Sequence, residues 1–336
     1  MNSRGCKSEV WILSGKGPLN DLASSLNVPV TNFDIDLHSS KFLWIFKLLK
    51  IGTRLRKSDF TVIHAFLPGV IILVLPLARI FAPSVKRIAG VRGSLQKSNF
   101  VIDSLYRVIL NNSWRIICNA QYLSRNLRDR YHVNPEKIHV IHNGVSRSEI
   151  SSVTDNEIPT ALVIGNFHSY KGHLLLLRVL SRIKADFRVI LCGSGPLREE
   201  ISKNIMQLNL SSKVTINDST DNVAESLRIA DFAIHPSETE GLSNAILEEL
   251  SAGLPVVAFE IGGNHELVTS GANGFLIEPF NLIEFQRRIE ELIKNRALRK
   301  KMSLEAAHTS QIFSWDVHIN QLLLIYNMNQ SESHTN

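Results

Sequence analysis

The stretch Ser237–Val268, SETEGLSNAILEELSAGLPVVAFEIGGNHELV, contains the pattern that decides the fold of this chain. It follows an apolar segment at 231–235 that is typical of a buried strand. Gly241–Ser243 then open an amphipathic helix, which ends at Gly253 and Pro255 before a second strand begins. The pattern therefore predicts one β-turn-α-turn-β unit. The start of such a helix presents free N–H groups and the positive end of the helix dipole, and phosphates bind at such places.

Two acidic residues frame this unit, Glu240 in the turn and Glu248 two turns into the helix. A single Glu on a helix is usually a solvated surface residue. Here the two acids are separated by seven residues within EGLSNAILEELSAGLPVVA. This stretch resembles glycosyltransferase family 4, whose signature is Glu-x7-Glu inside EG-L-N-A-LE-A-G-PVVA. The match runs through the whole stretch, which makes it specific, whereas an isolated Glu-x7-Glu would carry no information.

The resemblance implies an α/β chain of the GT-B fold, with two doubly wound Rossmann-like domains facing a cleft. It implies a retaining, metal-independent glycosyltransferase that needs no cofactor and uses a nucleotide-sugar, here a UDP-sugar, as its donor. The transferred group would be a hexosyl or N-acetylhexosaminyl unit. The acceptor would be a glycan or a polyprenyl-linked glycan in the biosynthesis of an envelope polysaccharide such as lipopolysaccharide or capsule.

The segment NFHSYKGHLLLLRVL, which begins at Asn166, resembles the family pattern GR-----KG---LL-A. In that pattern the Arg and the Lys hold the donor diphosphate. Lys171 and Gly172 match it, whereas Asn166 stands in place of the Arg. A neutral hydrogen bond in place of a charge-assisted one is expected to cost about 1 kcal/mol of donor binding, which is several-fold in affinity.

The remaining site residues are assigned by the same resemblance. Lys171, Glu240 and His64 are expected to take part in catalysis, Glu240 by orienting the donor sugar and His64 near that sugar at the end of its strand. Glu248 would bind the ribose hydroxyls. The other donor-binding residues would be Asn166, Gly193, Gly195, Gly241, Leu242, Ser243, Asn244 and Gly263. No metal ligand is expected, because Asp34-Ile35-Asp36 has no neighbouring ligand to complete a site.

Composition limits the class of protein. Hydrophobic residues make up 44% of the 336, and no run approaches the ~20 apolar residues of a membrane span. The segment 69–82, GVIILVLPLARIFA, is therefore predicted to be a core helix. The polar N-terminus carries no signal peptide pattern. Three scattered cysteines form neither a metal motif nor a disulfide framework, which favours the cytoplasm.

The net charge of +6 is unevenly distributed. Residues 1–150 hold 21 Lys and Arg against 9 Asp and Glu, whereas the remainder holds 16 against 22. An anionic membrane surface is one partner for such a basic half, so the chain could act as a peripheral protein at the inner face of the cytoplasmic membrane. Nucleic acid is not expected, because no helix-turn-helix, RNP or zinc pattern is present.

A basic helix is predicted in the first half. In the segment 39–57, Lys47, Lys50, Arg54 and Lys57 fall on one helical face. With Trp44, this helix could lie on a membrane. The alternative, which we favour, is a crossover helix that packs on its sheet and exposes a solvated basic face.

Strands alternate with helices throughout, which predicts parallel, doubly wound sheets. We expect an N-terminal acceptor-side domain at 1–146 and a nucleotide-sugar-binding domain at 147–312, with a polar linker at 146–159. Two helices are expected at 281–294 and 296–308. A closing helix at 313–329 would cross back to the first domain, and a disordered tail would follow at 330–336.

The beginning of the chain departs from the family. Only nine residues precede the strand at Val10, where the family has a first, central strand and a glycine-rich loop. Without that strand, its two neighbours would lose their ladder and bare apolar surface. Two other functions therefore remain open: a non-hydrolysing nucleotide-sugar epimerase, and an inactive or truncated homologue that binds the donor or acts as a scaffold.

Overall fold

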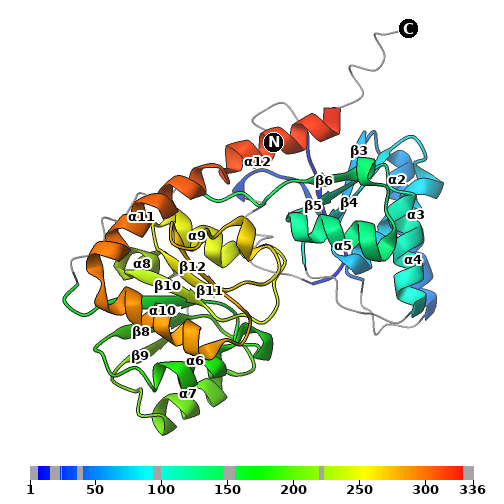
Figure 1. Cartoon of the computed structure of the whole chain (residues 1–336). Helices are drawn as coiled ribbons and strands as arrows, with labels where there is room; N and C mark the ends of the chain where they lie inside the picture. The colour runs from blue at the N-terminus through cyan, green and yellow to red at the C-terminus, as the bar shows by residue number, and fades with distance from the viewer. Residues whose placement is uncertain are drawn as a thin grey trace. The chain divides into compact units, whose positions relative to one another are not determined.

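The structure, a computed structural model, describes residues 7–15, 23, 25–35, 41–93, 100–146, 156–218 and 223–327, and only the backbone of residues 41–46. The chain divides into two compact units (Figure 1). Unit 1 comprises residues 1–92, 96–118 and 126–139, and unit 2 comprises 93–95, 119–125 and 140–336. Residues 140–146, expected in the first domain, thus belong to unit 2. Most of the predicted linker lies outside the described residues, and so does the whole predicted tail.

Unit 1 alternates strands and helices, as the sequence pattern predicts. Its elements are β1 (Val10–Ile12), β2 (Val30–Asn32), α2 (Lys41–Lys57), β3 (Val62–Phe66), α3 (Pro68–Phe81), β4 (Lys86–Val91), α4 (Phe100–Asn111), β5 (Arg115–Cys118), α5 (Gln121–Tyr131), the 3₁₀ turn η2 (Pro135–Lys137) and β6 (Ile138–Val140). The first residues of α5 and the last residue of β6 belong to unit 2.

The strands of unit 1 form two sheets, β1-β2 and β3-β4-β5-β6, in which β1 and β2, β3 and β4, and β4 and β5 pair in parallel. No strand among the described residues joins the two sheets. The expectation of bared apolar surface is wrong for Phe33 and Ile35, which are 4% and 2% exposed. They pack with Ile51 of α2 and Ala78 of α3 in a small core of their own.

Helix α2 packs on unit 1 through buried Ile51 and Leu55. Two of its four aligned cations contact neighbouring groups. The Lys47 ammonium donates to the carbonyl oxygen of Asp34, and the Arg54 guanidinium lies 2.7 Å from a Glu9 carboxylate oxygen. These contacts favour the crossover-helix interpretation over a membrane helix. The side chain of Trp44 lies outside the described residues.

Helix α3 is the apolar helix predicted at 69–82. Pro68 starts it, and Ile71, Val74, Leu75 and Ala78 are buried. Among the residues that the structure describes, no helix is long and apolar enough to cross a membrane.

Unit 2 contains the remaining elements. They are β7 (Thr160–Ile164), η3 (Ser169–Lys171), α6 (His173–Leu180), β8 (Arg188–Cys192), α7 (Arg198–Gln207), β9 (Val214–Asn217), α8 (Val223–Ile229), β10 (Phe232–His235), α9 (Asn244–Ser251), β11 (Val256–Phe259), η5 (Asn264–Glu266), β12 (Gly274–Ile277), α10 (Leu282–Lys294), α11 (Arg296–Gln311) and α12 (Trp315–Asn327).

The sheet of unit 2 is parallel and doubly wound, in the order β12-β11-β10-β7-β8-β9. Helices α6, α7 and α10 cover one face, and α8 and α9 cover the other (Figure 1). The strands are continuous apolar runs because both faces are covered. Phe167, Phe232, Phe259 and Phe285, each 1% exposed or less, fill the core between the layers.

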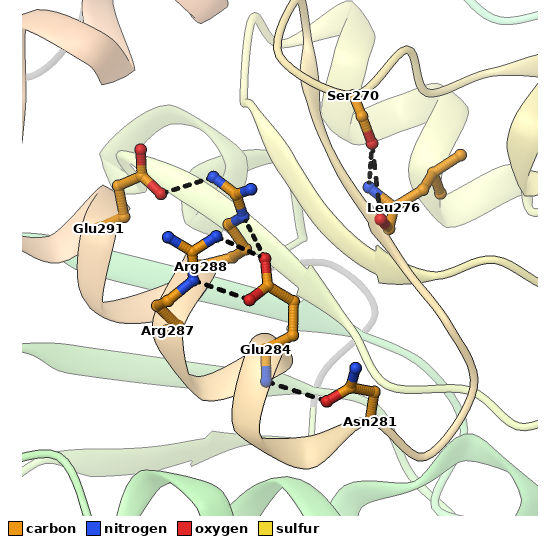
Figure 2. Close-up of polar contacts among 7 residues, drawn as sticks. All are labelled: Ser270, Leu276, Asn281, Glu284, Arg287, Arg288 and Glu291. Atoms are coloured by element: carbon orange, nitrogen blue, oxygen red, sulfur yellow. Dashed lines mark hydrogen bonds and ion pairs between the residues drawn. The ribbon is translucent and has the colours of Figure 1, made fainter.

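Local polar contacts define the start of α10 (Figure 2). The Asn281 side chain accepts a hydrogen bond from the backbone N–H of Glu284 and so caps the helix. The Glu284 carboxylate then pairs with Arg287 and Arg288, and Arg288 also contacts Glu291. Such pairs on a partly exposed helix face contribute little to stability, so the cap and the buried apolar face matter more for α10.

Helix α12 is tied to the segment that enters unit 2. The Val145 N–H donates to the Phe313 carbonyl at 2.8 Å, and the His318 ring lies 2.6 Å from the His142 carbonyl oxygen. A Cβ added to Gly144 would lie 2.5 Å from the Trp315 ring. Residues 140–145 are thus held against the closing helix.

Candidate functional site

The topology of unit 2 places the candidate site. The chain runs from β7 to β8 and β9 in one direction, and β10, β11 and β12 continue from the other side of β7. The switch point therefore lies between β7 and β10. Ligands of doubly wound sheets bind at the carboxyl ends of the strands beside such a point. Lys171 follows β7 and Glu240 follows β10, so the sheet brings these two predicted residues to one place.

Close backbone packing fixes the loop that carries Lys171. Gly172 has a φ of 72°, and a Cβ there would lie 2.0 Å from the Pro236 carbonyl oxygen. Only glycine fits this position without displacing the loop after β10. The Glu238 N–H also donates to the Tyr170 carbonyl at 2.8 Å. The Lys-Gly pair thus has a structural reason: the glycine lets the lysine loop lie directly on the Glu240 loop.

The centre of the site is a polar cluster around the Glu240 carboxylate. Its Oε1 lies 2.6 Å from the Lys171 ammonium and 3.1 Å from Nε2 of His235. Ser237 and Ser243 hydroxyls lie 3.2 and 3.1 Å from the same His235 nitrogen. Because a carboxylate can only accept, Nε2 of His235 carries the proton that it donates to Glu240. The cluster holds Glu240 in one orientation.

The charge of Glu240 follows from these contacts. Burial alone would raise its pKa, but the hydrogen bond from His235 and the nearby charge of Lys171 outweigh burial and lower the pKa to about 2. The side chains of Lys171 and Glu240 are 17% and 12% exposed, so the pair is largely shielded from water. Glu240 is therefore a permanent carboxylate at neutral pH.

The start of α9 lies beside this cluster. Ser243 is its N-cap, and the Ser243 hydroxyl accepts from the backbone N–H of Ile246 at 3.4 Å. Asn244, the first helical residue, is exposed, and its side chain accepts a hydrogen bond from Asn143 at 2.7 Å. Gly241 and Leu242 precede the cap and are buried. The first turn of α9 therefore presents backbone N–H groups next to Glu240.

A second loop closes on the same turn. The Gly263 N–H donates to the Gly241 carbonyl at 2.6 Å. At Gly262, with a φ of 50°, a Cβ would lie 2.1 Å from the Glu240 carbonyl oxygen. The structure thus brings Gly241, Leu242, Ser243, Asn244 and Gly263 together.

The predicted glycines after β8 lie against the loop after β7. The Phe167 N–H donates to the Ser194 carbonyl at 2.8 Å, and added Cβ atoms at Gly193 and Gly195 would lie within 3 Å of the backbone of Gly165 and Phe167. Asn166 is exposed between these residues. Both glycines therefore permit close backbone packing beside Asn166.

Glu248 is exposed in the middle of α9, five residues after the N-cap Ser243. Partial burial of its carboxylate raises its pKa, although the exposed position keeps the free-energy effect small. Its side chain is accessible to a ligand that also reaches the helix start.

Glu249 is the unexpected acid of the site. It is fully buried in α9, and burial together with the charge of Glu248 raises its pKa well above the usual range. The ammonium of Lys171 and the backbone of Ile164 oppose this rise. His173 is 2% exposed, and burial followed by the charges of His235 and Lys171 lowers its pKa to about 4. His173 is therefore neutral at pH 7, and Glu249 holds its proton more readily than an ordinary carboxyl group.

Glu249→Gln is expected to stabilise the protein increasingly as pH rises. Because the folded-state pKa is raised, the folded state holds its proton longer and loses stability as pH increases from the unfolded value of about 4.5 through the folded pKa. Thermal unfolding from about pH 4.5 to about pH 8 should show a growing gain in Tm over the wild type. The exposed control Glu305→Gln should show no such trend, and a pH-independent difference for Glu249→Gln would contradict the assignment.

Sequence reasoning missed His235, Ser237 and Glu249. His235 ends an otherwise apolar strand, and this polar residue at a strand terminus was the available signal. Glu249 adjoins Glu248, and neighbouring helical residues point about 100° apart, so the two acids can differ in burial. The sequence alone does not show which of them is buried.

His64 lies in unit 1. It was expected at the end of its strand, but β3 continues to Phe66, and His64 pairs with Ile88 two residues before the end. Its ring lies 4.1 Å from the Phe66 ring, and a Cβ on Gly90 would lie 2.7 Å from its Nε2. These contacts place the ring within the packing of unit 1.

Among the described residues, no three His, Cys, Asp or Glu side chains are arranged to hold a metal ion.

Two family models match this chain, one over each half. The family model "Glycosyltransferase Family 4" matches residues 1–149, and "Glycosyl transferases group 1" matches residues 147–309. The chain belongs to glycosyltransferase family 4. It is a glycosyltransferase, an enzyme that transfers a sugar.

Curated relatives include other glycosyltransferases. An uncharacterised glycosyltransferase of Methanocaldococcus jannaschii is 29% identical over 83% of this chain and 80% of its own length. The N-acetylgalactosamine-N,N'-diacetylbacillosaminyl-diphospho-undecaprenol 4-alpha-N-acetylgalactosaminyltransferase of Campylobacter jejuni is 25% identical over 59% of this chain and 56% of its own length.

Solved structures show the same fold. A glycosyltransferase from Rickettsia africae superposes with a TM-score of 0.83 at 21% identity, over 98% of this chain and 92% of that one. HepE of Anabaena in complex with UDP superposes with a TM-score of 0.83 at 19% identity, over 94% and 90% of the two chains. The two Rossmann-like units are those of the GT-B fold.

Proposed function

We propose that this glycosyltransferase moves a sugar, with retention of configuration, from a UDP-sugar to a glycan or polyprenyl-linked acceptor in envelope polysaccharide biosynthesis. The observation that supports the proposal best is the junction of Lys171, Glu240 and the start of α9 at the switch point of unit 2. These groups combine a cation, backbone N–H groups and a fixed carboxylate, which a phosphorylated sugar requires.

The chemistry follows from the charge that develops in the reaction. As the anomeric bond breaks, the leaving diphosphate gains negative charge, and the Lys171 ammonium with the N–H groups of residues 242–244 would stabilise it. No metal ion or cofactor is needed for that stabilisation. Glu240, fixed by His235, would accept hydrogen bonds from the donor sugar, and Glu248 would accept them from the ribose.

Relatives support the choice of donor and acceptor. HepE of Anabaena was solved with UDP and with UDP-glucose. The Campylobacter relative acts on a diphospho-undecaprenol acceptor by its name, and a Rhizobium meliloti relative is a lipopolysaccharide core biosynthesis glycosyltransferase. An enzyme with a lipid-linked acceptor works at a membrane surface, so we include a cytoplasmic, peripheral location at the inner face of the membrane.

One assay tests this function. The protein is incubated with radiolabelled UDP-glucose, UDP-N-acetylglucosamine or UDP-N-acetylgalactosamine, with and without a polyprenyl-diphosphate-linked glycan. We expect labelled glycolipid with an α linkage, established by NMR of the product. Epimerised UDP-sugar without an acceptor would support the epimerase, a β linkage would refute retention, and UDP binding without any turnover would support the inactive homologue.

Glu248→Gln is expected to weaken UDP binding about tenfold, because an amide offers one acceptor oxygen where the carboxylate offers two charged ones. Isothermal titration with UDP measures the change. Glu305→Gln, an exposed helical acid of the same unit, is the matched control. Equal UDP affinity in Glu248→Gln and the control would remove Glu248 from the donor site.

A further inference from the structure

Helix α4 of unit 1 carries apolar side chains on an exposed face as well as on its buried face. Tyr106, Ile109 and Leu110 are buried against the unit. Val101, Leu105 and Val108, spaced by four and three residues, form a second apolar stripe and are 72%, 45% and 57% exposed. Phe100, at the start of the helix, is 86% exposed. A surface helix normally carries polar residues on such a face, so this stripe is suited to an apolar partner.

The stripe ends in a basic and aromatic cluster. Asn112, which lies on the same helical face just after α4, accepts a hydrogen bond from Arg79 at 2.7 Å. Ile80 beside Arg79 is 71% exposed. Arg87 lies next to Trp114, whose backbone N–H donates to the Arg87 carbonyl at 2.8 Å. Burial, followed by the charge of Arg79, lowers the pKa of the Arg87 guanidinium, and a bound anion would raise it again.

Trp114 extends this cluster. The Lys86 ammonium lies 4.6 Å and the Arg115 guanidinium 5.3 Å from the centre of its ring. Trp beside Lys and Arg is a combination found at the interface between membrane and water. We call the stripe of α4 and this cluster together the α4 patch.

We propose that the α4 patch docks unit 1 on an anionic lipid bilayer, with Val101, Leu105 and Val108 entering the interface and Arg79 and Lys86 contacting lipid phosphates. Charge complementarity favours this partner, since residues 1–150 hold 21 basic against 9 acidic residues. A nucleic acid would leave the apolar stripe uncovered, and a second copy would bring two equally basic surfaces together.

The patch differs from the membrane helix that the sequence suggests. That helix, α2, uses cations in contacts within unit 1, whereas α4 combines exposed apolar side chains with a cationic end. The inference is independent of the donor site, because every residue of the patch lies in unit 1 and the donor residues other than His64 lie in unit 2.

Vesicle co-sedimentation of the full chain tests the proposal, with phosphatidylcholine vesicles and with vesicles that also contain phosphatidylglycerol. We expect binding to the anionic vesicles that weakens with added salt. The triple variant Val101→Ser/Leu105→Ser/Val108→Ser should bind about tenfold more weakly. Arg79→Gln/Lys86→Gln should lose about fivefold for each cation on anionic vesicles only.

The controls separate docking from folding and from self-association. Ile283→Ser changes an apolar residue on α10 that is 84% exposed, more than any residue of the stripe, and should bind like the wild type. Thermal unfolding and UDP titration should be unchanged in all variants. The proposal is overturned if the wild type does not bind anionic vesicles, if the triple variant binds as well as the wild type, or if light scattering shows a lipid-free dimer that the triple variant abolishes.

Discussion

Lys171→Ala is expected to reduce turnover about 100- to 1,000-fold, the usual effect of removing one group that stabilises developing negative charge. The ammonium lies in a largely buried site, 17% exposed, where its interaction with a diphosphate is weakly screened. Because the charge on the leaving group grows as the bond breaks, the loss should fall mainly on kcat and less on the donor KM. Initial rates with labelled donor at several concentrations measure both.

The matched control is Lys203→Ala, which removes an exposed lysine from α7 of the same unit and should leave kcat unchanged. Lys171→Arg should recover part of the activity, since it keeps the charge but changes its shape. If Lys171→Ala raises the donor KM while kcat stays near the wild-type value, the lysine binds the ground state and does not stabilise the leaving group.

The main elements of unit 2 were predictable because their signals are local. The Glu-x7-Glu stretch predicted β10, α9 and β11, and Asn281 and Asn295 mark the starts of α10 and α11 as N-caps. The pairing of Lys171 with Glu240 joins loops separated by 69 positions. Only the family resemblance connected these two loops, because no periodicity in the chain relates them.

The less predictable part concerns polar residues whose role depends on burial. His235 was included only as the end of an apolar strand, yet it contacts Glu240 and two serines. Strand patterns show that a residue is inside but not which buried groups it meets. The same limit applies to helices α2 and α4 of unit 1, because a sequence pattern does not show which side chains the packing leaves exposed. The basic spacing of α2 was visible in the sequence, whereas the exposure of the α4 stripe depends on how the helix packs on unit 1.

Glu240→Gln is expected to have two opposite effects. Transfer should fall about 100-fold or more, because the donor sugar loses a charged acceptor that His235 holds in place. Affinity for UDP should rise about fivefold. In the unliganded protein, the Glu240 carboxylate lies 2.6 Å from the Lys171 ammonium, so a diphosphate must compete with it for that cation. A neutral glutamine removes about 1 kcal/mol of this competition.

Isothermal titration with UDP and initial transfer rates separate the two effects. Glu238→Gln makes the same change of charge two residues away on an exposed side chain, and should alter neither quantity. A loss of UDP affinity in Glu240→Gln would mean that the Lys171–Glu240 pair persists when the donor binds and organises the site as a unit. A rise in UDP affinity together with lost transfer would mean that Lys171 exchanges its carboxylate partner for the diphosphate, while His235 keeps Glu240 in place for the sugar.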